Sequence, residues 1–179
     1  VRIYNRTLTA DEILELYNES LVSHSLVLKG SGDMTEIDTE GNHTAINNSD
    51  MVGVWRFEGN ALDSTTNGND GTVTGATNTS GMIGGAYEFD GVNGEIVIPD
   101  NPSLEGMAEI TVSAWFKPNS LQTTRVIDKF YNTYGFSLNA DGKIQVLFTT
   151  DDSGFNQKST SAVYSAGVWN YGVVTYNSS

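Results

Sequence analysis

The 179 residues carry 22 acidic and nine basic side chains, which gives a net charge of −13 at pH 7. This charge repels phosphate backbones and anionic surfaces, so it argues against nucleic acid and anionic membrane surfaces as partners. The sequence contains no cysteine, which excludes disulfides and cysteine-based metal or redox sites, and it has no apolar run long enough for a membrane span.

The chain opens with a short predicted strand, residues 1–4, and a short helix near residues 9–19. Thr9 and Glu12 have the spacing of a capping box, in which each side chain satisfies a backbone N–H of the first helical turn. An apolar stripe at helical spacing follows, formed by Ile13, Leu16 and Tyr17. Residues 20–50 are polar and rich in turn formers, which predicts a linker.

From residue 51 onward, short β-type runs are separated by turn residues about every 8–12 positions, a pattern typical of an antiparallel sandwich. NADGK, residues 139–143, predicts a hairpin, because Asp-Gly tolerates the positive φ of tight turns. Alternating polar and aromatic residues predict a strand over residues 52–58. Each tryptophan lies in a predicted strand, so we expect Trp55, Trp115 and Trp169 in the core.

Three segments together resemble a known family: VWRFEGNALDSTTNGNDGTVTG, GGAYEFDGVNGEIVIPDNPSL and ITVSAWFKP. Their order and spacing are similar to the opening half of laminin G-like domains, which belong to the concanavalin A-like lectin/glucanase superfamily. VRIYNRTLTADEILELY, residues 1–17, resembles the closing strand and terminal helix of the same domain. The resemblance implies an all-β fold, a jelly-roll β-sandwich of antiparallel sheets, with one short N-terminal helix.

The two matching blocks stand in reversed order, which predicts a window cut from a repeat protein. Residues 1–19 would close one repeat, residues 20–50 would link, and residues 51–179 would form a second domain that is incomplete at its C-terminus. We expect residues 1–4 to pair with the strand at residues 52–58, in the same chain or in a neighbouring copy. Strands expected after Tyr176 would come from adjacent sequence or another subunit, so this piece is not expected to be a stable isolated monomer.

The segment DSTTNGNDG, residues 63–71, is the candidate metal site. Oxygen-bearing side chains alternate at positions 63, 65 and 67 before a glycine, which resembles half of an EF-hand loop, but the twelfth position is Thr74 instead of glutamate. The family resemblance implies calcium as a possible cofactor. The alternative is a plain turn-rich connection. The candidate ligands are Asp63, Asn67, Asn69 and Asp70.

Two loop segments, FYNTYG and TTDDSGFNQ, are candidates for ligand binding, because aromatic rings and Asp/Asn side chains on end loops suit sugar recognition. An ordinary hairpin turn is the alternative for DDSG. The candidate residues are Tyr131, Tyr134, Asp151, Asp152, Phe155 and Asn156.

Catalysis is not expected. Glu88, Asp90 and Glu95 are the nearest approach to a glycosidase carboxylate pair. The turn at residues 90–94 would place Glu95 on a different strand. The sequence thus predicts a non-catalytic carbohydrate-binding or adhesion module of a secreted or surface multidomain protein. Its partners would be a glycan or an extracellular protein, and neighbouring repeats or subunits. The alternative is a structural spacer repeat in an extracellular array or filament.

Overall fold

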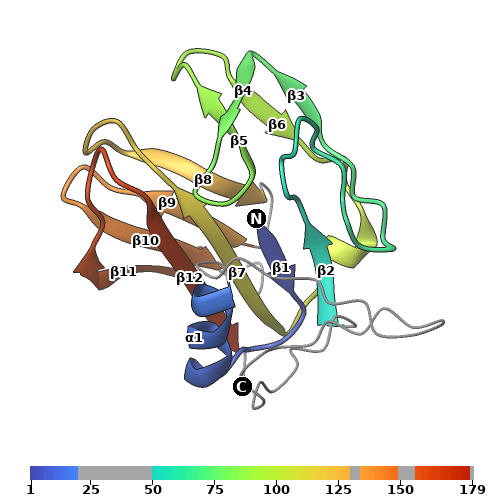
Figure 1. Cartoon of the computed structure of the whole chain (residues 1–179). Helices are drawn as coiled ribbons and strands as arrows, with labels where there is room; N and C mark the ends of the chain where they lie inside the picture. Colours follow the sequence, from blue (N-terminus) through green and yellow to red (C-terminus); the bar gives the residue numbers. More distant parts are fainter. Residues whose placement is uncertain (20–49, 130–133, 149–155, 178–179) are drawn as a thin grey trace, which may run out of the picture.

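The computed structural model describes residues 1–19, 50–129, 134–148 and 156–177. Two four-stranded antiparallel sheets form a sandwich, and two small two-stranded sheets stand above it in Figure 1. We call the sheet of order β12-β7-β1-β2 sheet I and the sheet of order β11-β10-β9-β8 sheet II. The predicted all-β sandwich of antiparallel sheets is confirmed.

The elements have the following bounds. Sheet I contains β1 (Arg2–Tyr4), β2 (Met51–Val54), β7 (Glu109–Phe116) and β12 (Asn170–Asn177). Sheet II contains β8 (Thr124–Lys129), β9 (Tyr134–Leu138), β10 (Lys143–Phe148) and β11 (Asn156–Val163). The small sheets pair β3 (Thr72–Thr74) with β6 (Glu95–Val97) and β4 (Ala76–Ser80) with β5 (Gly85–Phe89). The helix α1 spans Ala10–Glu19, and a 3₁₀ turn, η2, spans Pro102–Leu104.

The main core is built from apolar side chains of both sheets. Successive residues of a strand point to opposite faces. On β7, Ile110, Val112, Ala114 and Phe116 belong to this core, together with residues of β9 and β10. Aromatic contacts join the two sheets: Phe116 meets Phe136 edge-on, with ring centroids 5.7 Å apart. Alternation along β7 therefore determines which residues enter the core.

The N-terminal strand lies inside sheet I. β1 pairs antiparallel with β2 on one side, where Arg2 faces Val54, and with β7 on the other, where Ile3 faces Val112. The predicted pairing of residues 1–4 with the strand near residue 54 is confirmed, within the same chain. That residues 1–19 derive from a preceding repeat, and that further strands are needed after Tyr176, stay predictions.

The helix α1 packs on the face of sheet I that points away from sheet II (Figure 1). Its capping box is formed: the Glu12 amide donates to Thr9 Oγ1 at 3.3 Å, and the Thr9 amide donates to Glu12 Oε2 at 2.8 Å. Leu16 is buried in a small cluster with Tyr4 and Leu8. Among the described residues, no helix is long and apolar enough to cross a membrane.

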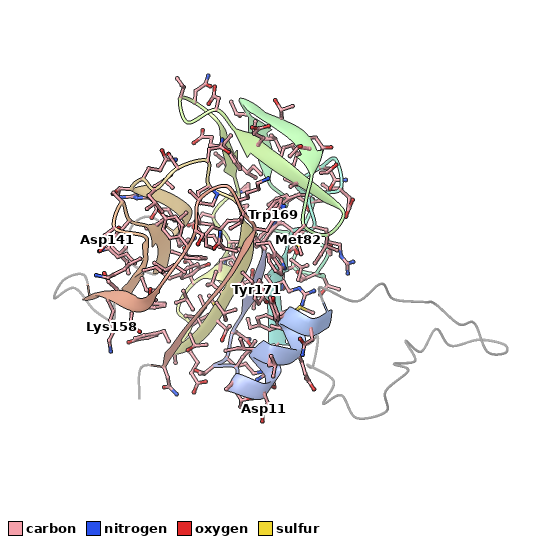
Figure 2. The ribbon with its side chains drawn as sticks, turned by 60° about the vertical axis from the view of Figure 1, so that its left-hand side comes forward. Asp11, Met82, Asp141, Lys158, Trp169 and Tyr171 are labelled. Atoms are coloured by element: carbon pink, nitrogen blue, oxygen red, sulfur yellow. The ribbon has the colours of Figure 1, made fainter. Side chains whose placement is uncertain are left out.

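The three tryptophans differ in their burial and in their position relative to the strands. Trp55 is 2% exposed, as predicted, although it stands just after β2 and joins Asp63 only through an isolated bridge. The prediction for Trp115 was wrong: it lies on the outer face of β7, half-buried, against Tyr17 and Tyr171. Figure 2 shows Tyr171 beside α1. Trp169 is half-buried and precedes β12, so it does not lie in a strand.

The strand predicted over residues 52–58 is shorter than expected. β2 ends at Val54, and Phe57 adopts a φ of 61°, a left-handed conformation that is rare for aromatic residues. The ring of Phe57 packs against the core and meets Tyr87 edge-on at 5.7 Å. This packing is a tertiary contact, so the alternation of residue types along the segment did not reveal the bend.

The two buried indole N–H groups lead to opposite expectations. Trp55 Nε1 donates to the Asn69 carbonyl at 2.8 Å, whereas Trp115 Nε1 is buried without a hydrogen-bond partner. Trp55→Phe should lower the free energy of unfolding by about 2–4 kcal/mol, because it leaves the buried Asn69 carbonyl without its donor and removes side-chain volume. Trp115→Phe should lower it by less than about 1 kcal/mol, because no hydrogen bond is lost. Urea denaturation measures both, and equal losses would contradict this account.

A second prediction concerns pH. Arg6 donates to both carboxylate oxygens of Glu12, at 2.9 and 2.7 Å, and to Asp50 at 2.8 Å, which ties the start of α1 to the start of β2. The hydrogen bonds from Arg6 and from the Thr9 amide lower the pKa of Glu12 from 4.5 to about 2. This contribution is therefore complete above about pH 4.5 and is lost as the pH falls toward 2.

The change that tests this prediction is Glu12→Gln, which removes the titrating group and keeps the side-chain shape. Between about pH 6 and about pH 3, the melting temperature of the variant should fall by less than that of the wild type. Melting curves over that range measure the effect, and parallel curves for the two proteins would contradict it.

Candidate functional site

The loop between β2 and β3 is organised by the carboxylate of Asp63. Its Oδ1 accepts hydrogen bonds from the amides of Val54 and Thr65, both at 2.9 Å. Its Oδ2 accepts from Thr65 Oγ1 at 2.7 Å and from the Asn69 amide at 3.0 Å. An ionised carboxylate offers about four acceptor positions. All four are used here by the protein itself.

The same loop covers the outer edge of β2, which among the described residues is the last strand of sheet I on that side. Three backbone groups of this edge are satisfied by the loop. The Val54 amide bonds to Asp63, and the Val54 carbonyl accepts from the Ser64 amide at 2.8 Å. The Val52 carbonyl accepts from the side-chain amides of Asn67 and Asn69, at 3.1 and 2.8 Å. The loop therefore occupies the place where a further strand would pair.

Asn69 is the buried anchor of the loop, with an exposed fraction of 2%. Besides its bond to Val52, its Nδ2 donates to Ser103 Oγ at 3.0 Å, in the turn η2. Its backbone carbonyl accepts the indole N–H of Trp55. A single residue, through its side-chain amide and its backbone carbonyl, thus connects the loop to β2, η2 and the core tryptophan.

The pKa of Asp63 is lowered. Partial burial alone would raise it, but the hydrogen bonds from Val54, Thr65 and Asn69 favour the ionised form more strongly. The carboxylate is held as an anion by N–H and O–H donors.

The side chains of the predicted calcium ligands are engaged in hydrogen bonds within the protein. Ca²⁺ takes six to eight oxygen ligands. Both oxygens of Asp63 are committed to internal hydrogen bonds, and the Asn69 amide is committed in the interior. Oδ1 of Asp70 accepts the Asp63 amide at 2.9 Å. Within the described part of the chain, no group of three or more His, Cys, Asp or Glu side chains is placed to hold a metal.

A second candidate region is one end of sheet II. Tyr134 and Asn156 each stand opposite Phe148, and Lys129 stands opposite Tyr134. Hence the connection from β8 to β9 and the connection from β10 to β11 both leave the same end of the sheet. The two loops in which the sequence predicted a ligand site belong to these two connections.

The predicted ligand residues are only partly described. Tyr131, Asp151, Asp152 and Phe155 lie outside the described residues, and Asn156 begins β11. Tyr134 was predicted in a loop, but it is the first residue of β9 and is 7% exposed. Burial, together with the charge of Glu105, raises its pKa. Its ring belongs to the core, because alternation along β9 carries it inward opposite Phe148.

A cation that the sequence did not single out lies at the same end. Lys129 forms ion pairs with Asp100 and, at 3.2 Å, with Glu105. Burial would lower the pKa of Lys129, but the hydrogen bonds that its ammonium group donates to Asp100 and Glu105 outweigh burial, and the pKa is raised. No local pattern could have shown this cluster, because Lys129 lies more than twenty positions from both carboxylates in the sequence.

The carboxylates considered for catalysis are placed apart, as predicted. Asp90 Oδ1 accepts the amides of Val92, Asn93 and Gly94, at 2.9, 3.2 and 3.3 Å. The turn that it organises sends the chain from β5 to β6, and these strands belong to different sheets. Glu88 stays on β5 and Glu95 lies on β6. Asp90 therefore has a structural role in this turn.

A laminin G-type family model, described as the concanavalin A-like lectin/glucanases superfamily, matches residues 89–179, which is 91 of 179 residues. The chain belongs to the concanavalin A-like lectin/glucanases superfamily. The match begins at the end of β5 and includes all of sheet II, together with β7 and β12 of sheet I.

The part of the resemblance that rested on residues 1–17 and 52–88 falls outside the matched range. No curated protein sequence and no solved structure matches the chain. The superfamily assignment therefore rests on residues 89–179 and agrees with the sandwich of sheets I and II.

The two asparagines that bond to Val52 make a matched pair. Asn69→Ala should lower the free energy of unfolding by about 2–3 kcal/mol, because it removes several buried hydrogen bonds. Asn67→Ala should lower it by less than about 1 kcal/mol, because its side chain is exposed and the Val52 carbonyl keeps a second donor. Chemical denaturation of both variants measures the difference. If Asn67→Ala lowered the free energy of unfolding as much as Asn69→Ala, burial would not explain the contribution of Asn69.

Proposed function

We propose that the chain is a non-catalytic carbohydrate-binding module of an extracellular or cell-surface protein, and that the loop end of sheet II is its binding surface. Domains of this superfamily are often non-catalytic binding modules. The binding residues in this proposal are Tyr131, Asp151, Asp152, Phe155 and Asn156, without Tyr134, whose ring is buried.

The observation that carries the proposal is the register of sheet II. Since Phe148 pairs with both Tyr134 and Asn156, the β8–β9 and β10–β11 connections start from neighbouring strand ends. Each connection contributes at least one aromatic residue, and the second contributes two adjacent aspartates. Loops at one end of a sandwich, positioned by a rigid sheet, commonly carry binding residues.

The composition of these loops suits a neutral, hydroxyl-rich sugar. Aromatic rings present flat apolar faces for stacking on sugar C–H groups, while carboxylates and amides accept and donate hydrogen bonds to hydroxyls. The net charge of −13 disfavours sulfated or otherwise anionic glycans. Neutral oligosaccharides are therefore the proposed ligand class.

The test compares two ends of the same sheet. The chain is first screened against neutral and anionic oligosaccharides on a glycan array, and affinities are then measured by calorimetry. Phe155→Ala and the double variant Asp151→Asn/Asp152→Asn should each weaken binding at least about tenfold.

Asp141→Asn is the control, because Asp141 lies in the β9–β10 turn at the opposite end of sheet II and should leave affinity unchanged. Figure 2 shows Asp141 at the margin of the molecule, away from α1. Equal losses in the control and test variants, or no glycan binding at all, would contradict the proposal. The second outcome would favour the spacer alternative.

A further inference from the structure

We infer that the loop over residues 63–70 closes the edge of sheet I without a metal ion, its side chains taking the place of a further strand beside β2. This inference concerns the segment whose composition resembles a calcium loop. It is independent of the proposed glycan binding, which lies on sheet II.

The first step is the count of acceptor positions on Asp63. Four donors already occupy its two oxygens, at distances of 2.7 to 3.0 Å. A cation bound to these oxygens would displace the amides of Val54 and Asn69, and those amides would then need other partners. An unmet buried amide is costly, so the hydrogen-bonded state competes directly with metal binding.

The second step is the direction of the alternating side chains. Thr65 Oγ1 donates to Asp63 and accepts the Asn67 amide at 3.2 Å. Asn67 and Asn69 both reach the Val52 carbonyl. The side chains at positions 63, 65 and 67, whose alternation suggested metal ligands, and that of Asn69 are therefore directed toward the loop backbone or toward β2.

The third step is the need that this arrangement meets. A strand at the edge of a sheet exposes N–H and C=O groups that invite pairing with another chain, and proteins block such edges. β2 has four residues, and the loop satisfies the amide and the carbonyl of Val54 and the carbonyl of Val52. Asn69 holds the loop in place from the interior, through Ser103 and Trp55. Hydrogen bonds within the chain therefore hold the loop in the conformation that a bound cation was expected to stabilise.

The experiment measures the melting temperature of the full chain in excess calcium chloride and in excess EDTA. The wild type should melt at the same temperature in both. Asp63→Asn should lower the melting temperature by about 4–8 °C, by the same amount in both solutions, because the amide cannot accept all four hydrogen bonds. Terbium provides a second readout: Trp55 lies against the loop, so an ion bound there would show sensitised luminescence, and none is expected.

Asp70→Asn is the matched control. Asp70 is exposed and accepts one amide of the loop, so its variant should lower the melting temperature less than Asp63→Asn. A calcium-dependent rise in the wild-type melting temperature that Asp63→Asn abolishes would overturn the inference. Terbium luminescence that both variants remove would also overturn it. So would an Asp63→Asn variant that melts at the same temperature as the wild type in EDTA.

Discussion

The antiparallel pairing of β1 with both β2 and β7 is the interaction on which sheet I depends. Ile3 faces Gly53 on one side and Val112 on the other. The three residues of β1 therefore join β2 to β7, which lie more than fifty positions apart in the sequence. Without β1, the facing backbone groups of β2 and β7 would lose their partners. The strand also brings α1 onto the outer face of the sheet, where Tyr17 covers Trp115.

Once β1 is in place, β2 becomes the edge of the sheet, and the loop over residues 63–70 follows from that position. Asp63 and Asn69 contribute side-chain hydrogen bonds where a neighbouring strand would contribute main-chain ones. The loop is bonded in turn to Trp55 and η2. The pairing of β1, the edge of β2 and the conformation of the loop thus form one connected arrangement.

Sheet II has connections of different length at its two ends. Its strands alternate so that two connections leave one end, while the tight β9–β10 turn closes the other. That turn needs Gly142 at a φ of 81° and is closed by a bond from its amide to the Asn139 carbonyl at 3.0 Å. A rigid sheet with one short end and one end with longer connections suits a module that binds through its loops.

The sequence by itself determined the local features of this protein. Thr9 and Glu12 specified the helix start, and Asp-Gly specified the β9–β10 turn, because each depends on residues near one another in the chain. Only the tertiary structure decided the rest. One face of β7 enters the core, and Trp115 lies on the other face. The pairing of β9 with β10 sets Tyr134 opposite Phe148, with its ring in the core. The partners of Asp63 include the Val54 amide of β2, nine positions away, and composition alone could not show that contact.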